Sequence, residues 1–176
     1  MSIQSRVRDE DSFDVAAMDR WLRTQVSDLP NAHELPDGLP RVTQFTRGAS
    51  NLTYRLTYGG HDLVLRRPPA GTKAASAHDM GREVHVINHV RDQFPYVPRI
   101  DAYCTDDSVI GSHFYVMEYL DGTILRPESA DALTSDQAHD VGRVYVDRWA
   151  DLHSVDVGRA GSVSYTHLTL PTRLMV

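Results

Sequence analysis

Cysteine is nearly absent from this sequence, since Cys104 is the single example among 176 residues. One cysteine excludes an internal disulfide and leaves a cysteine-based metal cluster without partners. Long apolar runs are absent too. No segment reaches the roughly 20 residues of a membrane-spanning helix, and residues 1–14 hold no apolar signal core. We therefore expect no membrane partner and, by default, a cytoplasmic protein.

Positive charge is also in short supply, with 18 Lys and Arg against 24 Asp and Glu and a formal net charge of −6. Because no basic run stands out, the composition argues against a nucleic-acid partner. Hydrophobic residues make up 41% and charged residues 24%, both close to globular averages, so global disorder is not expected. A chain of this length can hold one ordinary domain with a core, and its oligomeric state cannot be inferred from sequence.

The most informative pattern lies in residues 41–69. It predicts a strand, a glycine turn, a second strand, a hairpin at Gly59-Gly60 and a third strand ended by two prolines. A glycine turn followed by a strand that carries a cation can cover phosphates with its backbone N–H groups. An ordinary tight hairpin explains the spacing equally well, because one glycine is a weaker signal than G-x-G-x-x-G. The predicted phosphate-covering residues are Gly48, Ala49, Ser50 and Asn51.

The remaining pattern completes an α+β fold. Residues 1–13 are polar and expected to fray, and residues 27–40 are expected to form a linker. Three strands, a helix and two strands then predict a five-stranded antiparallel sheet with one helix on it, as in the small lobe of a protein-kinase-like fold. The predicted helices span 14–26, 77–91 and 134–154, and the later strands span 99–104 and 113–119.

The helix predicted at 134–154 has a clear start. Thr134 and Gln137 fit a capping box, in which each side chain satisfies the other residue's backbone N–H. One stripe of this helix is apolar, the pattern of a helix that turns one face to a core, and we expect the core it would pack on to belong to the missing part of the large lobe. The stripe consists of Ala138, Val141, Tyr145, Trp149 and Leu152.

These motifs together resemble the aminoglycoside phosphotransferase-type kinases, in the subgroup that is linked to acyl-CoA dehydrogenases. The resemblance covers about residues 14–157. It rests on several short motifs that occur in the family's order. They are GASNLTY at 48–54, VLRRPP at 64–69, HD at 78–79 with RE at 82–83, VPR at 97–99, GSHFYVMEYLDG at 111–122 and LHSVD at 152–156.

The resemblance implies an ATP site. Arg66 occupies the position of the third-strand lysine of protein kinases, and Glu83 is the matching carboxylate on the following helix. Met117, Glu118 and Tyr119 match the hinge, whose backbone pairs with adenine in such kinases. Without the resemblance, Arg66 and Arg67 could be solvated charges at the sheet edge, Glu83 could pair locally, and Met117 could be a core residue.

The catalytic groups of the family are missing. Relatives carry an HGD-x-x-x-x-N segment and a later aspartate for magnesium, and neither occurs here. We therefore predict no catalytic residues in this chain, which would be the N-terminal part of an ATP-dependent kinase acting on a hydroxyl of a small molecule. Mg²⁺ is expected only for the complete parent protein. The alternative is a non-catalytic nucleotide-binding module, a pseudokinase or an interaction module.

The predicted domains follow from these motifs. Residues 1–38 form an N-terminal helix and linker, 39–122 the small lobe with its hinge, and 123–162 the start of an incomplete large lobe. Residues 163–176 leave the family pattern and resemble vector-derived read-through, so they are expected to be non-native. A divergent natural tail or an edge strand is the alternative.

Two histidines suggest a metal site at first sight, because His85 and His89 are four residues apart on one predicted helix. The zinc-protease pattern requires a glutamate directly after the first histidine, and Val86 stands there instead. Since no third ligand is evident, we predict no metal site.

Overall fold

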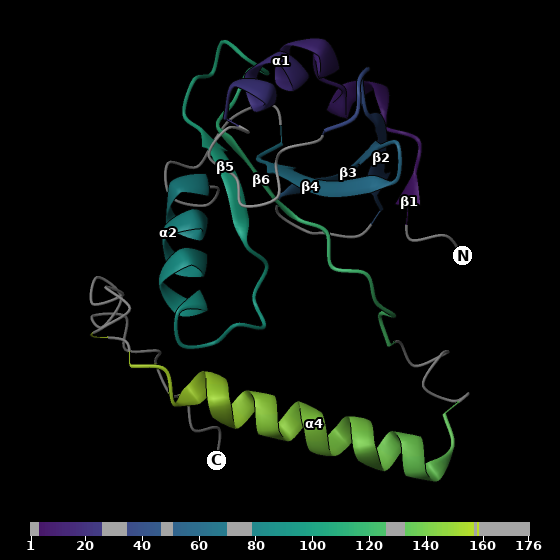
Figure 1. Cartoon of the computed structure of the whole chain (residues 1–176), viewed down its shortest axis with the longest axis vertical. Helices are drawn as coiled ribbons and strands as arrows, with labels where there is room; N and C mark the ends of the chain where they lie inside the picture. Colours follow the sequence, from purple (N-terminus) through teal and green to yellow (C-terminus); the bar gives the residue numbers. More distant parts are fainter. Residues whose placement is uncertain are drawn as a thin grey trace, which may run out of the picture. The chain divides into compact units, whose positions relative to one another are not determined.

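The computed structural model describes residues 4–25, 35–46, 51–69, 79–125, 133–156 and 158. Within them, strands and helices follow the predicted order (Figure 1). The elements are β1 (Gln4–Ser5), the 3-10 helix η1 (Asp9–Asp11), α1 (Val15–Gln25), β2 (Arg41–Phe45), β3 (Leu52–Tyr58), β4 (His61–Arg67), α2 (Met80–Arg91), β5 (Ile100–Cys104), β6 (Phe114–Glu118) and α4 (Ser135–His153).

The sheet is antiparallel throughout, in the order β1-β2-β3-β4-β6-β5. The five predicted strands are all present, and the α+β class and the kinase-like small lobe are confirmed. A two-residue strand that was not predicted, β1, adds a sixth strand at the edge by pairing Gln4 with Phe45. The glycine hairpin is also confirmed, because Gly59 and Gly60 have φ of 53° and 104°, a region that favours glycine.

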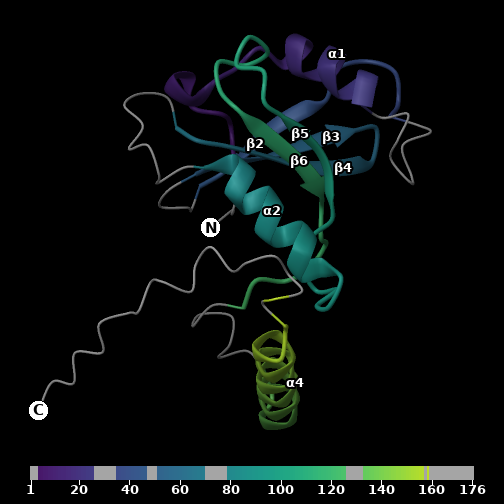
Figure 2. The ribbon, with the colours of Figure 1, turned by 90° about the vertical axis from the view of Figure 1, so that its left-hand side faces the viewer.

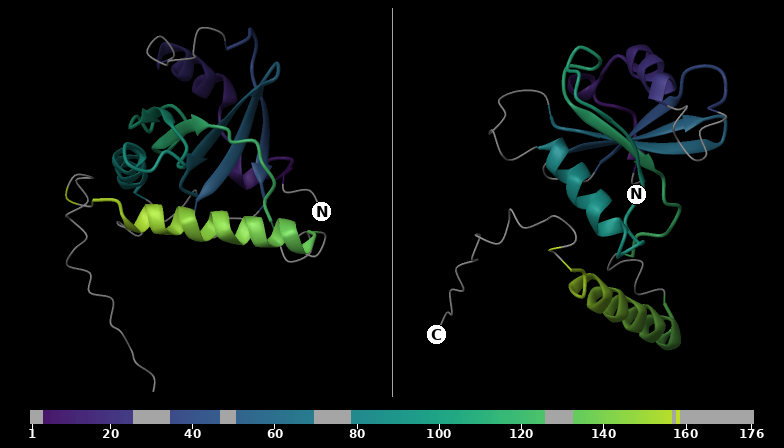
Figure 3. Two further views of the ribbon diagram at one scale, coloured as in Figure 1. Left: turned by 60° about the horizontal axis from the view of Figure 1, so that its bottom comes forward. Right: turned by 60° about the vertical axis from the view of Figure 1, so that its left-hand side comes forward.

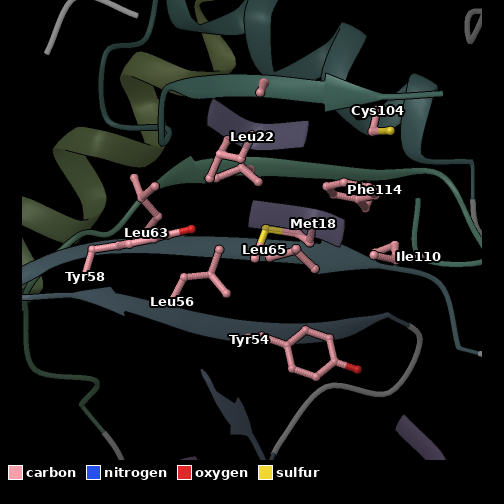
Figure 4. Packing of buried hydrophobic residues seen from close by; sticks show 12 residues of the cluster. Met18, Leu22, Tyr54, Leu56, Tyr58, Leu63, Leu65, Cys104, Ile110 and Phe114 are labelled. Carbon is pink, nitrogen blue, oxygen red and sulfur yellow. The ribbon is translucent and has the colours of Figure 1, made fainter. Parts of the chain in front are cut away.

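One face of the sheet is sealed by α1. Along β3, Tyr54, Leu56 and Tyr58 are buried, whereas the residues between them are half-buried, as the period of two in a strand requires. Met18 and Leu22 of α1 are fully buried against this row, and Figure 4 shows them among the strand side chains. This cluster is the main core.

The other face of the sheet carries α2, so that the sheet lies between two helices (Figure 2). Met80 and Val84 of α2 pack on Tyr115 of β6. The helix approaches β5 closely at Gly81, where an added Cβ would lie 3.0 Å from the Tyr103 hydroxyl oxygen. Because glycine has no Cβ, Gly81 allows α2 to lie this close to β5.

The prediction that the N-terminal residues fray is wrong for residues 4–13. Asp11 is buried, and its carboxylate accepts a hydrogen bond of 2.7 Å from the Gln44 side chain and lies 2.6 Å from Arg8. The Tyr54 hydroxyl donates to the Asp11 carbonyl oxygen at 2.7 Å. The segment is polar because its partners are polar groups of the sheet, and the sequence pattern alone does not reveal such partners.

The interpretation of Arg67 as a solvated edge charge is also wrong. Only 5% of Arg67 is exposed, because its place two residues after Leu65 turns it toward the α1 face. Its guanidinium donates to the carbonyl oxygens of Asp11 at 2.7 Å, Ser12 at 3.3 Å and Ile110 at 3.5 Å. Arg67 therefore ties the N-terminal segment and the loop before β6 to the sheet.

The chain divides into two compact units, residues 1–88 with 98–120 and residues 89–97 with 121–176. In the second unit, α4 is one unbroken helix (Figure 3) with the predicted capping box of Thr134 and Gln137. No residue of α4 is buried, and Trp149 is 57% exposed. The predicted domain boundaries stay predictions, and residues 163–176 lie outside the described residues.

We expect Arg67→Lys to lower the free energy of unfolding by about 2–3 kcal/mol. The planar guanidinium donates to three carbonyl oxygens at once, and a lysine ammonium group cannot reach all three. The matched control is Arg143→Lys on α4, whose side chain is 60% exposed and forms only surface ion pairs, so it should change little. Urea unfolding of the 176-residue chain measures both. Equal effects of the two substitutions would contradict the structural role of Arg67.

Candidate functional site

The residues predicted to bind nucleotide do not all fall in the described part of the chain. Gly48, Ala49 and Ser50 lie outside it, so the predicted phosphate-covering turn stays a prediction. Asn51, Arg66 and Glu83 are described, and the fold brings their side chains together. They form a polar cluster on the α2 face of the sheet.

Glu83 is the centre of this cluster. Its Oε1 accepts a hydrogen bond of 2.6 Å from Nδ2 of Asn51, and its Oε2 accepts one of 2.9 Å from the Tyr115 hydroxyl. Nε of Arg66 lies 3.1 Å from Oε2, which makes an ion pair. Local pairing of Glu83 along its own helix is therefore not what the structure shows.

Arg66 is held loosely compared with its neighbours. Its Nε, although close to Glu83, is not aligned for a hydrogen bond, and the aligned contact from Nη2 to Oε1 is long at 3.5 Å. The side chains of Arg66 and Glu83 are 32% and 31% exposed. Among the described residues, Nη1 of Arg66 has no hydrogen-bond acceptor. The guanidinium can therefore receive a second anion without breaking a tight bidentate pair.

The strand register explains why these residues meet. Arg66 pairs with Thr53 on β3 and with Tyr115 on β6, so all three side chains share one face. Asn51 directly precedes β3. Glu83 lies in the first turn of α2, whose start is capped by the Asp79 side chain accepting from the Arg82 N–H at 3.0 Å.

Tyr115 belongs to the site although the sequence analysis did not select it. Burial raises the pKa of its phenol well above the ordinary value, an effect that Arg66 opposes and the hydrogen bond to Glu83 reinforces. The phenol therefore stays protonated and donates to Glu83. A correct prediction that β4 pairs with β6 could have identified Tyr115, because Tyr115 is the residue of β6 that pairs with Arg66.

The predicted hinge residues lie at the end of β6. Met117 packs, half-buried, into the cluster beneath α2, which agrees with the alternative that it is a core residue. The Glu118 N–H donates to the Arg99 carbonyl oxygen at 3.0 Å. Tyr119 follows the strand, and the guanidinium carbon of Arg55 lies 4.4 Å from its ring centre.

Comparison with known protein families gives a match that covers this part of the chain. Residues 41–173 match the phosphotransferase enzyme family. The chain belongs to that family. The match includes every described residue of the polar cluster, so the family assignment and the site rest on the same part of the chain.

The chain is also similar to named proteins. It is 34% identical over 161 residues to acyl-CoA dehydrogenase family member 11 of Gallus gallus, covering 92% of this chain and 20% of that protein. For the Homo sapiens protein of the same name, identity is 31% over 154 residues, with coverage of 87% and 19%. The chain thus spans about a fifth of the length of these relatives.

A crystal structure of a protein assigned as an aminoglycoside phosphotransferase from Ralstonia eutropha has the same fold. Its TM-score is 0.68 at 27% sequence identity, and the similarity covers 88% of this chain and 42% of the other. Sequence family and structural neighbour therefore agree on a kinase-like phosphotransferase fold.

The part of the chain that the structure describes lacks two further features. It contains no group of three His, Cys, Asp or Glu side chains placed to hold a metal ion. It also contains no helix that is long and apolar enough to cross a bilayer. The absence of a metal site in the whole chain stays a prediction.

We expect Tyr115→Phe to destabilise the chain by about 1 kcal/mol, because Glu83 loses a hydrogen bond while packing is kept. Tyr103→Phe is the matched control, since Tyr103 packs in the same cluster and its hydroxyl has no hydrogen-bond partner among the described residues. Urea unfolding compares the two variants. If both variants have the same urea midpoint as the wild type, the hydrogen bond from Tyr115 to Glu83 does not stabilise the chain.

The Arg55–Asp62 pair predicts a dependence of stability on pH. Hydrogen bonds from Arg55 and Thr57 hold the pKa of Asp62 below its usual 3.8. The pair therefore stabilises the fold above the unfolded-state pKa and loses this effect as pH falls through the folded-state pKa. The wild type should exceed Asp62→Asn in free energy of unfolding by more at pH 7 than at about pH 3. Urea unfolding at both pH values measures this difference, and a difference that does not change with pH would contradict the prediction.

Proposed function

We propose that this chain is the nucleotide-binding part of an ATP-dependent phosphotransferase that acts on a hydroxyl group of a small molecule. The observation that carries the proposal is the Arg66–Glu83 pair, which lies half-exposed on one face of the sheet and leaves Nη1 of Arg66 without an acceptor among the described residues. The family assignment supports the reaction class. The cytoplasmic location expected from the sequence is part of the same proposal.

Arg66 would bind the phosphates. Arginine keeps its charge at all physiological pH values and presents a planar fork that suits phosphate oxygens. Glu83 would hold this fork in place, and Asn51 and Tyr115 would hold Glu83 through their hydrogen bonds. A single ion pair in water contributes little, but a carboxylate fixed by two further donors is pre-organised.

The adenine would lie farther along the same face. On β3, Thr53, Arg55 and Thr57 are only half-buried, in contrast with the sealed row on the α1 side. This leaves exposed sheet surface between the polar cluster and the end of β6. The hinge backbone at the end of β6 would then pair with the base, as the family resemblance implies, through groups other than the Glu118 N–H, which donates to Arg99.

Transfer of the phosphate would need groups that this sequence does not contain. A kinase of this class positions the acceptor hydroxyl with an aspartate and holds magnesium with further carboxylate and amide groups. The HGD-x-x-x-x-N segment is absent from the sequence. We therefore propose that the chain binds nucleotide without transferring phosphate by itself, and that Mg²⁺ and acceptor activation belong to the complete parent protein. The names of the relatives support an acceptor with an acyl chain.

Nucleotide binding predicts thermal stabilisation of the chain by ATP. A ligand present at about ten times its Kd contributes roughly 1.4 kcal/mol, which corresponds to a rise in Tm of about 3–5 °C for a chain of this size. Arg66→Met and Glu83→Gln should weaken ATP binding about 10- to 100-fold, the loss expected for a charged hydrogen bond. Arg143→Met removes a charge from α4 and should leave the ATP effect unchanged.

The same experiment separates the alternatives. No rise in Tm at millimolar ATP, with or without magnesium, would contradict the proposal and leave an interaction module. A rise in Tm that Arg66→Met does not weaken would contradict the assigned phosphate site. Phosphate transfer by the purified chain to a small-molecule hydroxyl would overturn the proposed absence of catalysis.

A further inference from the structure

Arg55 lies on the same sheet face as Arg66 but is bound in a different way. Its Nε donates to Oδ1 of Asp62 at 2.9 Å and its Nη2 to Oδ2 at 2.5 Å. Thr57 adds a bond of 2.7 Å to the same carboxylate. The side chains of Arg55 and Asp62 are 27% and 17% exposed. Since this bidentate pair neutralises the guanidinium and fixes its plane, Arg55 is a poor candidate for a phosphate ligand.

The fixed plane of Arg55 contacts Tyr119. The guanidinium carbon lies 4.4 Å from the centre of the Tyr119 ring, within the range of a cation–π contact. Tyr119 stands just beyond the last pair of the β4–β6 ladder, Leu63 with Glu118. In the part of the chain that the structure describes, no ladder pair includes Tyr119, and the contact of its ring with Arg55 restrains the chain at this point.

A second arginine, Arg99, restrains Glu118, the residue before Tyr119. The backbone N–H of Arg99 donates to Oε1 of Glu118 at 2.9 Å, and Nη1 lies 3.7 Å from Oε2. Nε of Arg99 in turn donates to Asp101, whose side chain is 1% exposed, at 2.6 Å. The two successive hinge residues are thus restrained from opposite sides, by β3 through Arg55 and by the chain at β5 through Arg99.

We propose that Arg55 and Tyr119 form a positioning pair that fixes the hinge backbone for binding the nucleotide base, separately from Arg66 and Glu83, which bind the phosphates. This inference rests on the proposed function and divides its site into two independent halves. Arg55 acts through Tyr119 and need not touch the nucleotide. Restraining the hinge before binding lowers the conformational entropy lost when the base binds.

The test compares three ligands, ATP, adenosine and inorganic tripolyphosphate, by calorimetry on the 176-residue chain. We expect Tyr119→Leu to weaken adenosine and ATP about five- to tenfold, within the range of a partly buried cation–π contact, and to leave tripolyphosphate unchanged. Tyr119→Phe keeps the aromatic ring and should therefore bind adenosine and ATP with the affinity of the wild type. Arg55→Lys, which cannot form the planar pair, should weaken adenosine as well. Arg66→Met should give the opposite pattern, with tripolyphosphate and ATP weakened and adenosine unchanged.

A readout without nucleotide distinguishes the failure of this inference from that of the proposed function. Hydrogen exchange at the amides of residues 119–121 should be several-fold faster in Tyr119→Leu than in the wild type. If exchange and adenosine affinity are both unchanged, the positioning pair is overturned while the proposed function stands. If the wild type binds none of the three ligands, the proposed function fails, and the inferred base site fails with it. Faster exchange with unchanged adenosine affinity would also overturn the role in base binding.

Discussion

The register between β3 and β4 is the constraint on which the rest of the structure depends. Seven residue pairs join the two strands, from Leu52 with Arg67 to Tyr58 with His61. The two-glycine turn between them sets this register, because both glycines adopt positive φ. A slip by one residue would move every side chain of a strand to the opposite face, and would exchange the environments of Arg66 and Arg67.

Those adjacent arginines show how one strand can place one side chain for stability and the next for the nucleotide binding that we propose. Arg67 faces α1 and is buried among carbonyl oxygens, where it connects segments that are distant in the sequence. Arg66 faces α2 and remains half-exposed beside Glu83. Arg55 completes the contrast, since its charge is neutralised by a bidentate carboxylate. The guanidinium of Arg66 is held more loosely than the other two, since its aligned hydrogen bond to Glu83 is 3.5 Å long, and we therefore propose it as the phosphate ligand.

Sequence patterns predicted the strands, the hairpin and the capping box because these depend on local chemistry. Thr134 and Gln137 are three residues apart, and β3 alternates along its own length. The same reasoning failed for residues 4–13, whose order comes from Gln44, Tyr54 and Arg67. Local polarity predicted exposure there, whereas the polar partners lie more than thirty residues away. Tyr115 was missed for a similar reason, because its neighbours are set by strand pairing.

The sequence by itself determined the order of the elements, the alternation of the strands and the family resemblance, since each is written in neighbouring residues. It also placed Arg66 and Glu83 as candidates. Only the tertiary structure decided that Asn51 and Tyr115 join them, that Arg67 is a core residue, and that Arg55 stacks on Tyr119. The physical reason is that these contacts depend on the pairing and packing of separate strands and helices, which the spacing of residues along the chain does not specify.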